Sequence, residues 1–187
     1  MPNPRLAGRY AKSLLDLANE RNELEAVYND MLYLQAVCSK SRDVLNLLRS
    51  PIITADKKEA ILKEITKGKI GESTSAFIRL LVIKGREAFL PEVIVAFISQ
   101  YKRQKDIHTL KLTTATPVSE ELKKQIIERV QGQTKLKNIE LTATVKEDLI
   151  GGFLLEIGDT LVDASILYDL NKIRSQFLNN DFIYKLR

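Results

Sequence analysis

The spacing of apolar residues changes once along this chain of 187 residues, close to residue 105. Before that point apolar residues recur every three or four positions, which is the spacing of one face of an α-helix. After it, β-branched residues and threonines alternate from Ile107 to Thr114, which is typical of a β-strand. We therefore expect an α+β protein with two domains: an N-terminal six-helix bundle over 1–105 and a smaller strand-containing α/β domain over 106–187.

Helix ends in the first half are predicted from capping and breaking residues. Ser41 and Thr54 are expected to cap the third and fourth helices with their hydroxyl groups. Pro51 ends the third helix, because the residue before a proline is displaced from the helical region, and Gly85 ends the fifth. The buried side of the fourth helix is predicted to consist of Ala60, Ile61, Leu62 and Ile65.

In the second half, one helix is expected to begin at the cap Ser119 and to face the core with Leu122, Ile126, Ile127 and Val130. Two strands are predicted over Ile139–Val145 and Phe153–Ile157. Gly158-Asp159 is then a two-residue turn that returns the chain as another strand over Thr160–Asp163. A last helix is expected to carry the apolar residues Ile166, Leu167, Leu170, Ile173 and Phe177.

Few residues are suited to catalysis or to binding a metal or cofactor. His108 is the only histidine and Cys38 the only cysteine, which excludes an internal disulfide and the usual ligand set of a zinc site. We expect Cys38 to be a buried small hydrophobe, and His108, without a nearby acidic pair, to be packed or solvent-facing rather than a general base. The glycines at 151, 152 and 158 lack the spacing of a phosphate loop or a dinucleotide fingerprint. The expectation is a protein with no catalytic residues, metal or cofactor.

An enzyme that uses Asp148, Asp159 or Asp163 is a weaker hypothesis, because these residues lack the order of a calcium loop and have no partner base. The charge favours another alternative. Residues 1–105 hold 18 Lys+Arg against 12 Asp+Glu, a net +6, whereas 106–187 hold 11 against 12. A basic helical module that binds nucleic acid or an anionic surface therefore stays open, although aromatic residues make up only 6% of the chain and tryptophan is absent.

Two helices carry more apolar residues than one packing layer requires, over Leu6–Ala18 and Ala76–Ile83. They are either central helices of the bundle or the walls of a groove that receives an amphipathic helix of a partner. Neither a secretory signal in the first ten residues nor a run of about 18 apolar residues is recognisable, so we expect no membrane span.

Several motifs resemble one known family. They include the run Arg9-Tyr10-Ala11-Lys12-Ser13-Leu14, the segment Phe77–Leu81, and the strongest match, Leu149-Ile150-Gly151-Gly152-Phe153. In this order and spacing they resemble the delta subunit of bacterial ATP synthases and its mitochondrial counterpart, the oligomycin-sensitivity-conferring protein. After Ser165 that family usually has a basic and small stretch, whereas this chain has Ile166–Asp169. The structural signature of the resemblance is Gly151, Gly152, Gly158, Asp159, Asp163 and Ser165.

The resemblance implies a non-catalytic stator subunit of the F-type ATP synthase, present as one copy in a hetero-oligomer. Domain 1–105 would bind the N-terminal helix of an alpha subunit on the catalytic head, through its first and fifth helices. Domain 106–187 would hold the C-terminal ends of the b subunits, so that proton-driven rotation is coupled to ATP synthesis. Association with the cytoplasmic face of a bacterial cell membrane would be indirect, with no nucleic acid bound. The expected alpha-facing residues are Tyr10, Ala11, Leu14, Ala18, Phe77, Ile78 and Leu81.

Overall fold

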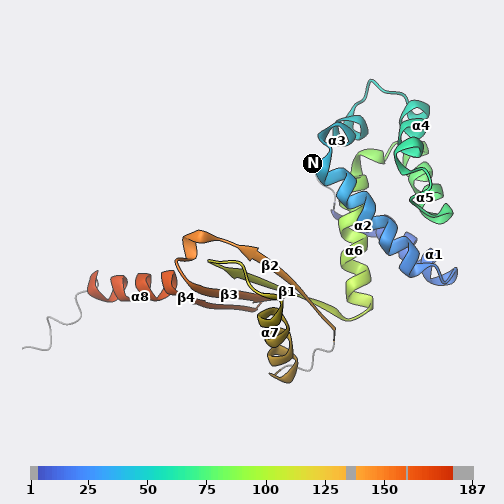
Figure 1. Cartoon of the computed structure of the whole chain (residues 1–187). Coiled ribbons are helices and arrows are strands. Elements are labelled where there is room, and N and C mark those ends of the chain that lie inside the picture. Colours follow the sequence, from blue (N-terminus) through green and yellow to red (C-terminus); the bar gives the residue numbers. More distant parts are fainter. Residues whose placement is uncertain (1–3, 134–137, 159, 179–187) are drawn as a thin grey trace, which may run out of the picture. The chain divides into compact units, whose positions relative to one another are not determined.

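The computed structural model describes residues 4–133, 138–158 and 160–178 (Figure 1). The chain divides into two compact units, Met1–Lys105 and Asp106–Arg187. The described elements of the first unit are all helical, and those of the second combine helices with a four-stranded sheet. The predicted α+β fold class is therefore confirmed.

All six helices predicted in the first half are present. Their bounds are α1 (Pro4–Glu20), α2 (Leu24–Lys40), α3 (Arg42–Arg49), α4 (Ala55–Thr66), α5 (Glu72–Ile83) and α6 (Leu90–Gln104), with a short 3₁₀ turn η1 (Glu87–Phe89) before the last. Gly85 follows α5 at a φ of 61°, a left-handed conformation that glycine adopts without strain. Ser41 and Thr54 occupy the predicted N-cap positions, but neither hydroxyl bonds to its helix, so that part of the capping prediction is wrong.

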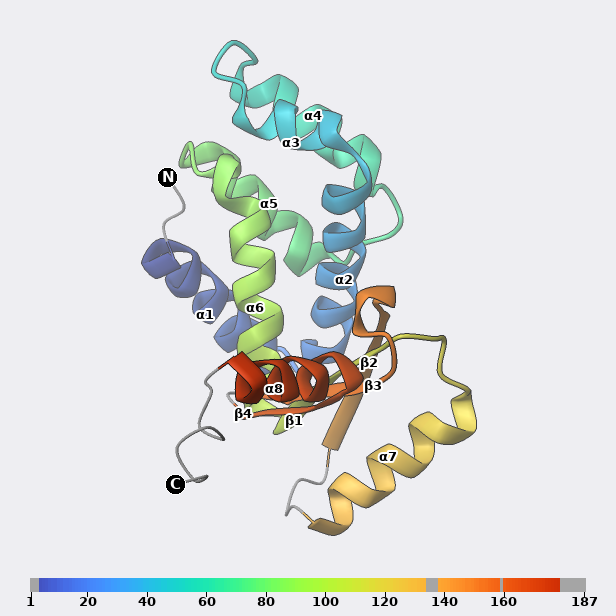
Figure 2. The ribbon, with the colours of Figure 1, turned by 90° about the vertical axis from the view of Figure 1, so that its left-hand side faces the viewer.

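The core of the first unit forms around α6, which lies between α1 and α2 (Figure 2). Phe97 and Val93 on α6 are completely buried, as is Met31 on α2. Leu14 contributes from α1 and Leu48 from α3. Removing such large apolar side chains from water supplies most of the free energy that holds a bundle together.

The buried side of α4 differs from the prediction. Ala60 and Ile61 are exposed, and Lys58 is buried instead. The Nζ of Lys58 lies 2.7 Å from Glu87 Oε1 and donates a hydrogen bond of 3.2 Å to the carbonyl oxygen of Leu48. Because the ammonium has both an ion-pair partner and an acceptor, its burial is tolerated, which an apolar pattern cannot anticipate.

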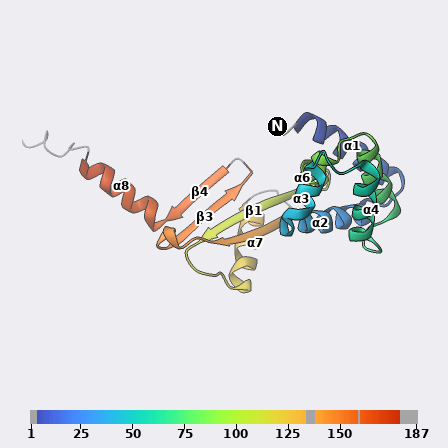
Figure 3. The same cartoon turned by 90° about the horizontal axis from the view of Figure 1, so that it is seen from above.

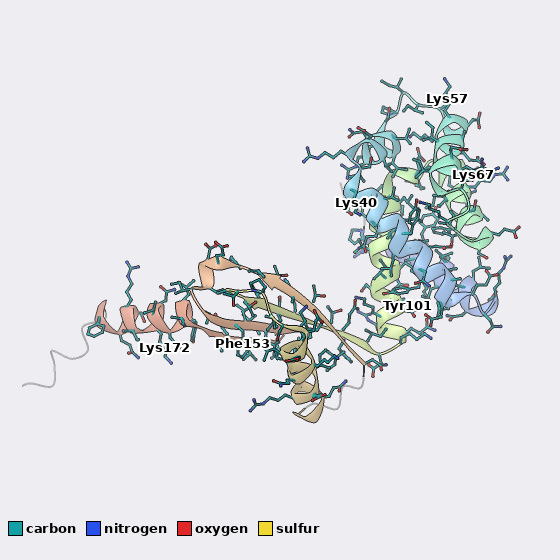
Figure 4. All side chains as sticks on the ribbon, viewed as in Figure 1. Lys40, Lys57, Lys67, Tyr101, Phe153 and Lys172 are labelled. Carbon is teal, nitrogen blue, oxygen red and sulfur yellow. The ribbon has the colours of Figure 1, made fainter. Side chains whose placement is uncertain are left out.

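The last turn of α6 is attached to α2 by a ring stack and two charge-assisted bonds. The rings of Tyr28 and Tyr101 stack with centroids 3.9 Å apart (Tyr101 is labelled in Figure 4). The hydroxyl of Tyr101 donates to Glu25 Oε2 at 2.6 Å, and the Nζ of Lys105 lies 2.8 Å from Glu25 Oε1. Burial, followed by the hydrogen bond to Glu25, raises the pKa of Tyr101 to about 12.

The second unit follows the predicted order of strands and helices. Its elements are β1 (Ile107–Thr114), α7 (Glu120–Gln133), β2 (Asn138–Val145), the 3₁₀ turn η2 (Glu147–Leu149), β3 (Gly152–Ile157), β4 (Thr160–Ser165) and α8 (Ile166–Leu178). The strand order is β2-β1-β3-β4, with β1 parallel to β2 and antiparallel to β3. A parallel pair needs a crossover, which α7 provides, whereas β3 and β4 form a hairpin (Figure 3).

Register gives this sheet one mainly apolar face and one face with both charged and apolar residues. Leu112 pairs with Leu155, and Leu155 pairs with Val162, which places these side chains on the apolar face. On the opposite face, Lys111 Nζ lies 3.0 Å from Glu156 Oε2.

The outcome for α7 is mixed. Ser119 caps it as predicted, accepting a hydrogen bond of 3.3 Å from the backbone N–H of Leu122. Val130 is buried, and Ile126 and Ile127 are half-buried. Leu122 is exposed, so the prediction that it faces the core is wrong.

The Tyr101 contacts lead to a testable pH dependence. The ordinary tyrosine pKa is 10.0 and that of Tyr101 is about 12, so folding stabilises the protonated phenol. This contribution is complete below pH 10 and is lost as the pH rises toward about 12. The difference in unfolding free energy between the wild type and Tyr101→Phe, measured by urea denaturation, should shrink over this window. A difference that stays constant would contradict the assignment.

Candidate partner-binding surfaces

The structure brings the predicted groove residues together on α1 and α5, where the Tyr10 and Phe77 rings meet edge-on with centroids 6.4 Å apart. Tyr10 is half-buried. The other six have exposed fractions of at most 7% and fill the interior of the unit: Ala11, Leu14, Ala18, Phe77, Ile78 and Leu81. In this chain on its own, these six are buried and only Tyr10 of the seven is substantially exposed, so their predicted contact with a partner stays a prediction.

A different set of α5 residues forms an outward apolar stripe. Leu80 is 44% exposed and Ile83 is 64% exposed, and Ala76 lies on the same face one turn earlier. The polar residues Ser73 and Thr74, by contrast, are buried. Sequence reasoning missed this stripe because α5 is apolar around most of its circumference, so periodicity does not indicate which side faces solvent.

A groove of about 630 Å³ lies beside this stripe, between α4 and α5. Apolar side chains of Leu62, Ile78 and Leu80 line it, and charged residues also border it. One of the charged pairs joins the two helices, with Arg79 Nε 3.3 Å from Glu59 Oε1. An apolar groove with a charged border is the kind of surface on which an amphipathic helix can bind.

The second unit also carries an exposed apolar surface. Phe153 and Val162 are exposed on the apolar face of the sheet (Phe153 is labelled in Figure 4). The main contacts of α8 are with β4 and η2, and its residues from Tyr168 to Phe177 are exposed. One stripe of α8, at the spacing of a single helix face, is at least 46% exposed: Ile166, Leu170, Ile173 and Phe177. Exposed apolar patches of this kind typically mark sites of protein–protein interaction.

The signature residues determine how α8 leaves the sheet. Gly152 has a φ of 76°, and a Cβ added there would collide with the carbonyl oxygen of Ala164 on β4. Asp163 Oδ1 accepts a hydrogen bond of 2.9 Å from the N–H of Ser165. Ser165 Oγ in turn accepts 3.1 Å from the N–H of Tyr168, which caps the first turn of α8.

The other signature glycines have related structural roles. The carbonyl oxygen of Gly151 accepts a hydrogen bond of 3.1 Å from the N–H of Ile166. Gly158 has a φ of 55° at the start of the turn between β3 and β4. Asp159 lies outside the described residues. The signature residues that the structure describes therefore shape the hairpin and the junction between β4 and α8.

Cys38 and His108 were also considered for chemistry. Cys38 is buried as expected, and burial raises the pKa of its thiol. His108 has one acidic contact that the sequence analysis did not identify, because its Nε2 lies 3.0 Å from Asp106 Oδ1, and its side chain is partly exposed. Local chain geometry produces this pair, since Asp106 has a φ of 53° just before β1.

Residues 4–133, 138–158 and 160–178 lack two further features. No group of three or more His, Cys, Asp and Glu residues there is arranged to hold a metal ion. In the same ranges, no helix has both the length and the apolar character needed to cross a membrane.

The features on these two units define a class of protein: a two-unit adaptor whose distinctive surfaces are exposed apolar helix and sheet faces. Its sequence matches the family described as ATP synthase delta (OSCP) subunit over residues 6–177. It is 34% identical over 177 residues to the ATP synthase subunit delta of Cytophaga hutchinsonii, covering 95% of this chain and 96% of that protein. It is 38% identical over 170 residues to the ATP synthase subunit delta of Chlorobaculum parvum, covering 91% and 93%.

A solved structure agrees with these relatives. One chain of the Toxoplasma gondii mitochondrial ATP synthase hexamer, determined by cryo-EM, has a TM-score of 0.71 and 26% sequence identity, over 92% of this chain and 97% of that chain. The chain therefore belongs to the ATP synthase delta (OSCP) subunit family. It is a non-catalytic stator subunit of the F-type ATP synthase and a peripheral part of a membrane-bound complex, which confirms the predicted family and function.

The Gly152 geometry gives a prediction for the second unit. Gly152→Ala should destabilise it by about 2–4 kcal/mol, because the new methyl group collides with backbone at a left-handed φ. Faster amide hydrogen exchange in β3 and β4 would report the loss. Gly132→Ala is the matched control: it lies in α7 with no atom within 4 Å of an added Cβ and should stabilise by about 0.5–1 kcal/mol. Equal exchange in the two variants would rule out the steric role of Gly152.

Proposed function

We propose that the first unit binds the N-terminal helix of an alpha subunit on the catalytic head and that the second unit holds the C-terminal ends of the b subunits. One observation supports this division most strongly: each unit carries its own exposed apolar helix stripe, on α5 and on α8. A stator subunit must connect two other bodies, and two separate docking surfaces satisfy that requirement.

For the alpha subunit, the proposed surface combines the exposed edge of Tyr10 with the α5 stripe at Ala76, Leu80 and Ile83. The buried groove residues support this surface from beneath, as Phe77 does at the ring of Tyr10. An amphipathic helix would lay its apolar side chains along the stripe. Its polar residues would meet charged side chains at the border, including Arg79.

For the b subunits, the proposed surface combines the α8 stripe with the uncovered part of the apolar sheet face around Phe153 and Val162. Within the described part of the second unit, α8 packs mainly on β4 and η2, and its side chains from Tyr168 to Phe177 are exposed (Figure 4). A partner helix packed there would bury apolar groups that this chain leaves in water. That burial would make the contact slow to dissociate, as a subunit under torque requires.

We place the subunit, as one copy, at the cytoplasmic face of a bacterial cell membrane, attached through its partners. Relatives named ATP synthase subunit delta from Cytophaga hutchinsonii and Chlorobaculum parvum support its membership of a bacterial ATP synthase.

The alpha contact is tested with a peptide of the alpha N-terminus and the full chain. Leu80→Asp should weaken binding at least about tenfold by calorimetry, because a charge would be desolvated within an apolar contact. Val95→Asp is the matched control, since Val95 is an exposed apolar residue on α6 outside the stripe. Equal binding by the two variants would exclude Leu80 from the interface.

Salt dependence separates this proposal from the basic-module alternative. Apolar helix docking should change little with salt, whereas binding of nucleic acid or another polyanion should fall steeply. If the chain binds duplex DNA with a steep salt dependence and shows no saturable binding of the alpha peptide, the basic-module alternative replaces the alpha contact.

The b contact is tested by co-purification of tagged chain from membrane extracts. Leu170→Asp should reduce recovery of b subunits while alpha subunits are still recovered through the first unit. Asn171→Asp adds the same charge at a neighbouring exposed position of α8 and should leave recovery unchanged. Full recovery of b with Leu170→Asp would exclude the α8 stripe from the contact.

A further inference from the structure

The start of α5 has no cap of its own. Its N-cap residue is Gly71, which has no side chain to accept a hydrogen bond from the first turn. Ser73 and Thr74 in that turn are buried, so their hydroxyl groups need partners inside the protein.

Asp30 on α2 supplies the missing acceptor. It is only 8% exposed, and its Oδ2 accepts 2.8 Å from the N–H of Gly71 and 2.6 Å from the hydroxyl of Thr74. One carboxylate oxygen thus joins the N-cap residue and the third residue of α5. A negative charge at this end of a helix is also favoured by the helix dipole.

A second carboxylate holds the same turn. Glu23 Oε2 accepts a hydrogen bond of 2.6 Å from the hydroxyl of Ser73, and Arg21 Nη1 donates to that hydroxyl at 3.2 Å. Glu23 is the N-cap residue of α2, seven positions or about two turns before Asp30, so both carboxylates reach α5 from the same face of α2. The first turn of α5 is therefore anchored by polar contacts at three residues, Gly71, Ser73 and Thr74.

This anchor matters because apolar packing alone does not specify the rotation of α5. Phe77, Ile78 and Leu81 face inward, yet Leu80 and Ile83 face outward with similar hydropathy. Adjacent residues of an α-helix differ by about 100° around the axis, so a rotation of one residue would exchange Leu80 for Leu81 at the surface. Hydrogen bonds to specific atoms of the first turn exclude such a rotation.

We propose that Asp30 is a positioning residue for partner binding, which anchors the first turn of α5 and thereby sets the face that the helix presents at Ala76, Leu80 and Ile83. This inference rests on the proposed alpha contact. Asp30 touches no partner in it and acts only through α5.

The test uses Asp30→Ala, Asp30→Asn and, as a control, Asp43→Ala, which removes an exposed carboxylate from α3 in the same unit. Asp30→Ala should weaken binding of the alpha N-terminal peptide about tenfold while the chain stays helical by circular dichroism. Asp30→Asn keeps one side-chain oxygen, which can still accept from both the N–H of Gly71 and the hydroxyl of Thr74, so its affinity should stay within about threefold of wild type. Asp43→Ala should bind like the wild type.

A folded Asp30→Ala chain that binds the peptide like wild type overturns the proposal. The Asn variant shows whether the hydrogen-bond acceptor, rather than the charge, is what Asp30 contributes. If Asp30→Ala does not fold, Thr74→Val decides instead, since it keeps the side-chain shape and removes one anchoring bond. Peptide affinity equal to wild type in that variant also overturns it.

A wild-type chain that fails to bind the peptide refutes the alpha contact, not the anchor. Amide exchange over 72–76 then decides: faster exchange in Asp30→Ala than in Asp43→Ala supports the anchor, and equal exchange overturns it.

Discussion

The structure of the first unit depends on the burial of α6 between α1 and α2. Phe97 and Val93 lose all contact with water there, and the helices on either side are placed by packing against them. At its far end α6 is held by Tyr101, whose hydroxyl bonds to Glu25 at the start of α2. This central packing leaves α4 and α5 at the periphery, where polar contacts contribute more to their placement.

Those polar contacts share one property: each joins a buried polar group to an element distant in sequence. Lys58 reaches Glu87, and Asp30 reaches the first turn of α5. A buried polar group without a partner is costly, so such contacts strongly favour one arrangement over alternatives that bury similar apolar area. This specificity suits a subunit whose exposed apolar stripes must face outward in a defined direction. The second unit achieves the same end with Gly152 and Ser165, which determine the exit of α8 from the sheet.

Much of the fold could be predicted because it depends on local chain properties. Pro51 and Gly85 end helices through backbone restrictions that act within a few residues, and the alternation at Ile107–Thr114 identifies β1. The candidate site could be predicted less well from the sequence. Apolar residues on α1 and α5 indicated that these helices matter, but six of the seven residues selected there lie in the interior. Residue type alone does not distinguish an apolar side chain that is buried in the core from one that is exposed on a partner-binding surface.

The sequence by itself determined the helices, the strands, their order and the family to which the chain belongs, because periodicity, turn residues and motifs are properties of the linear chain. Only the tertiary structure decided which side of α5 is exposed. It placed Leu80 and Ile83 in solvent and buried Ser73 and Thr74, the reverse of what hydropathy favours. The physical reason is that Asp30 and Glu23, distant in sequence, satisfy those hydroxyl groups inside the protein, and a helix that is apolar nearly all round takes its rotation from these bonds.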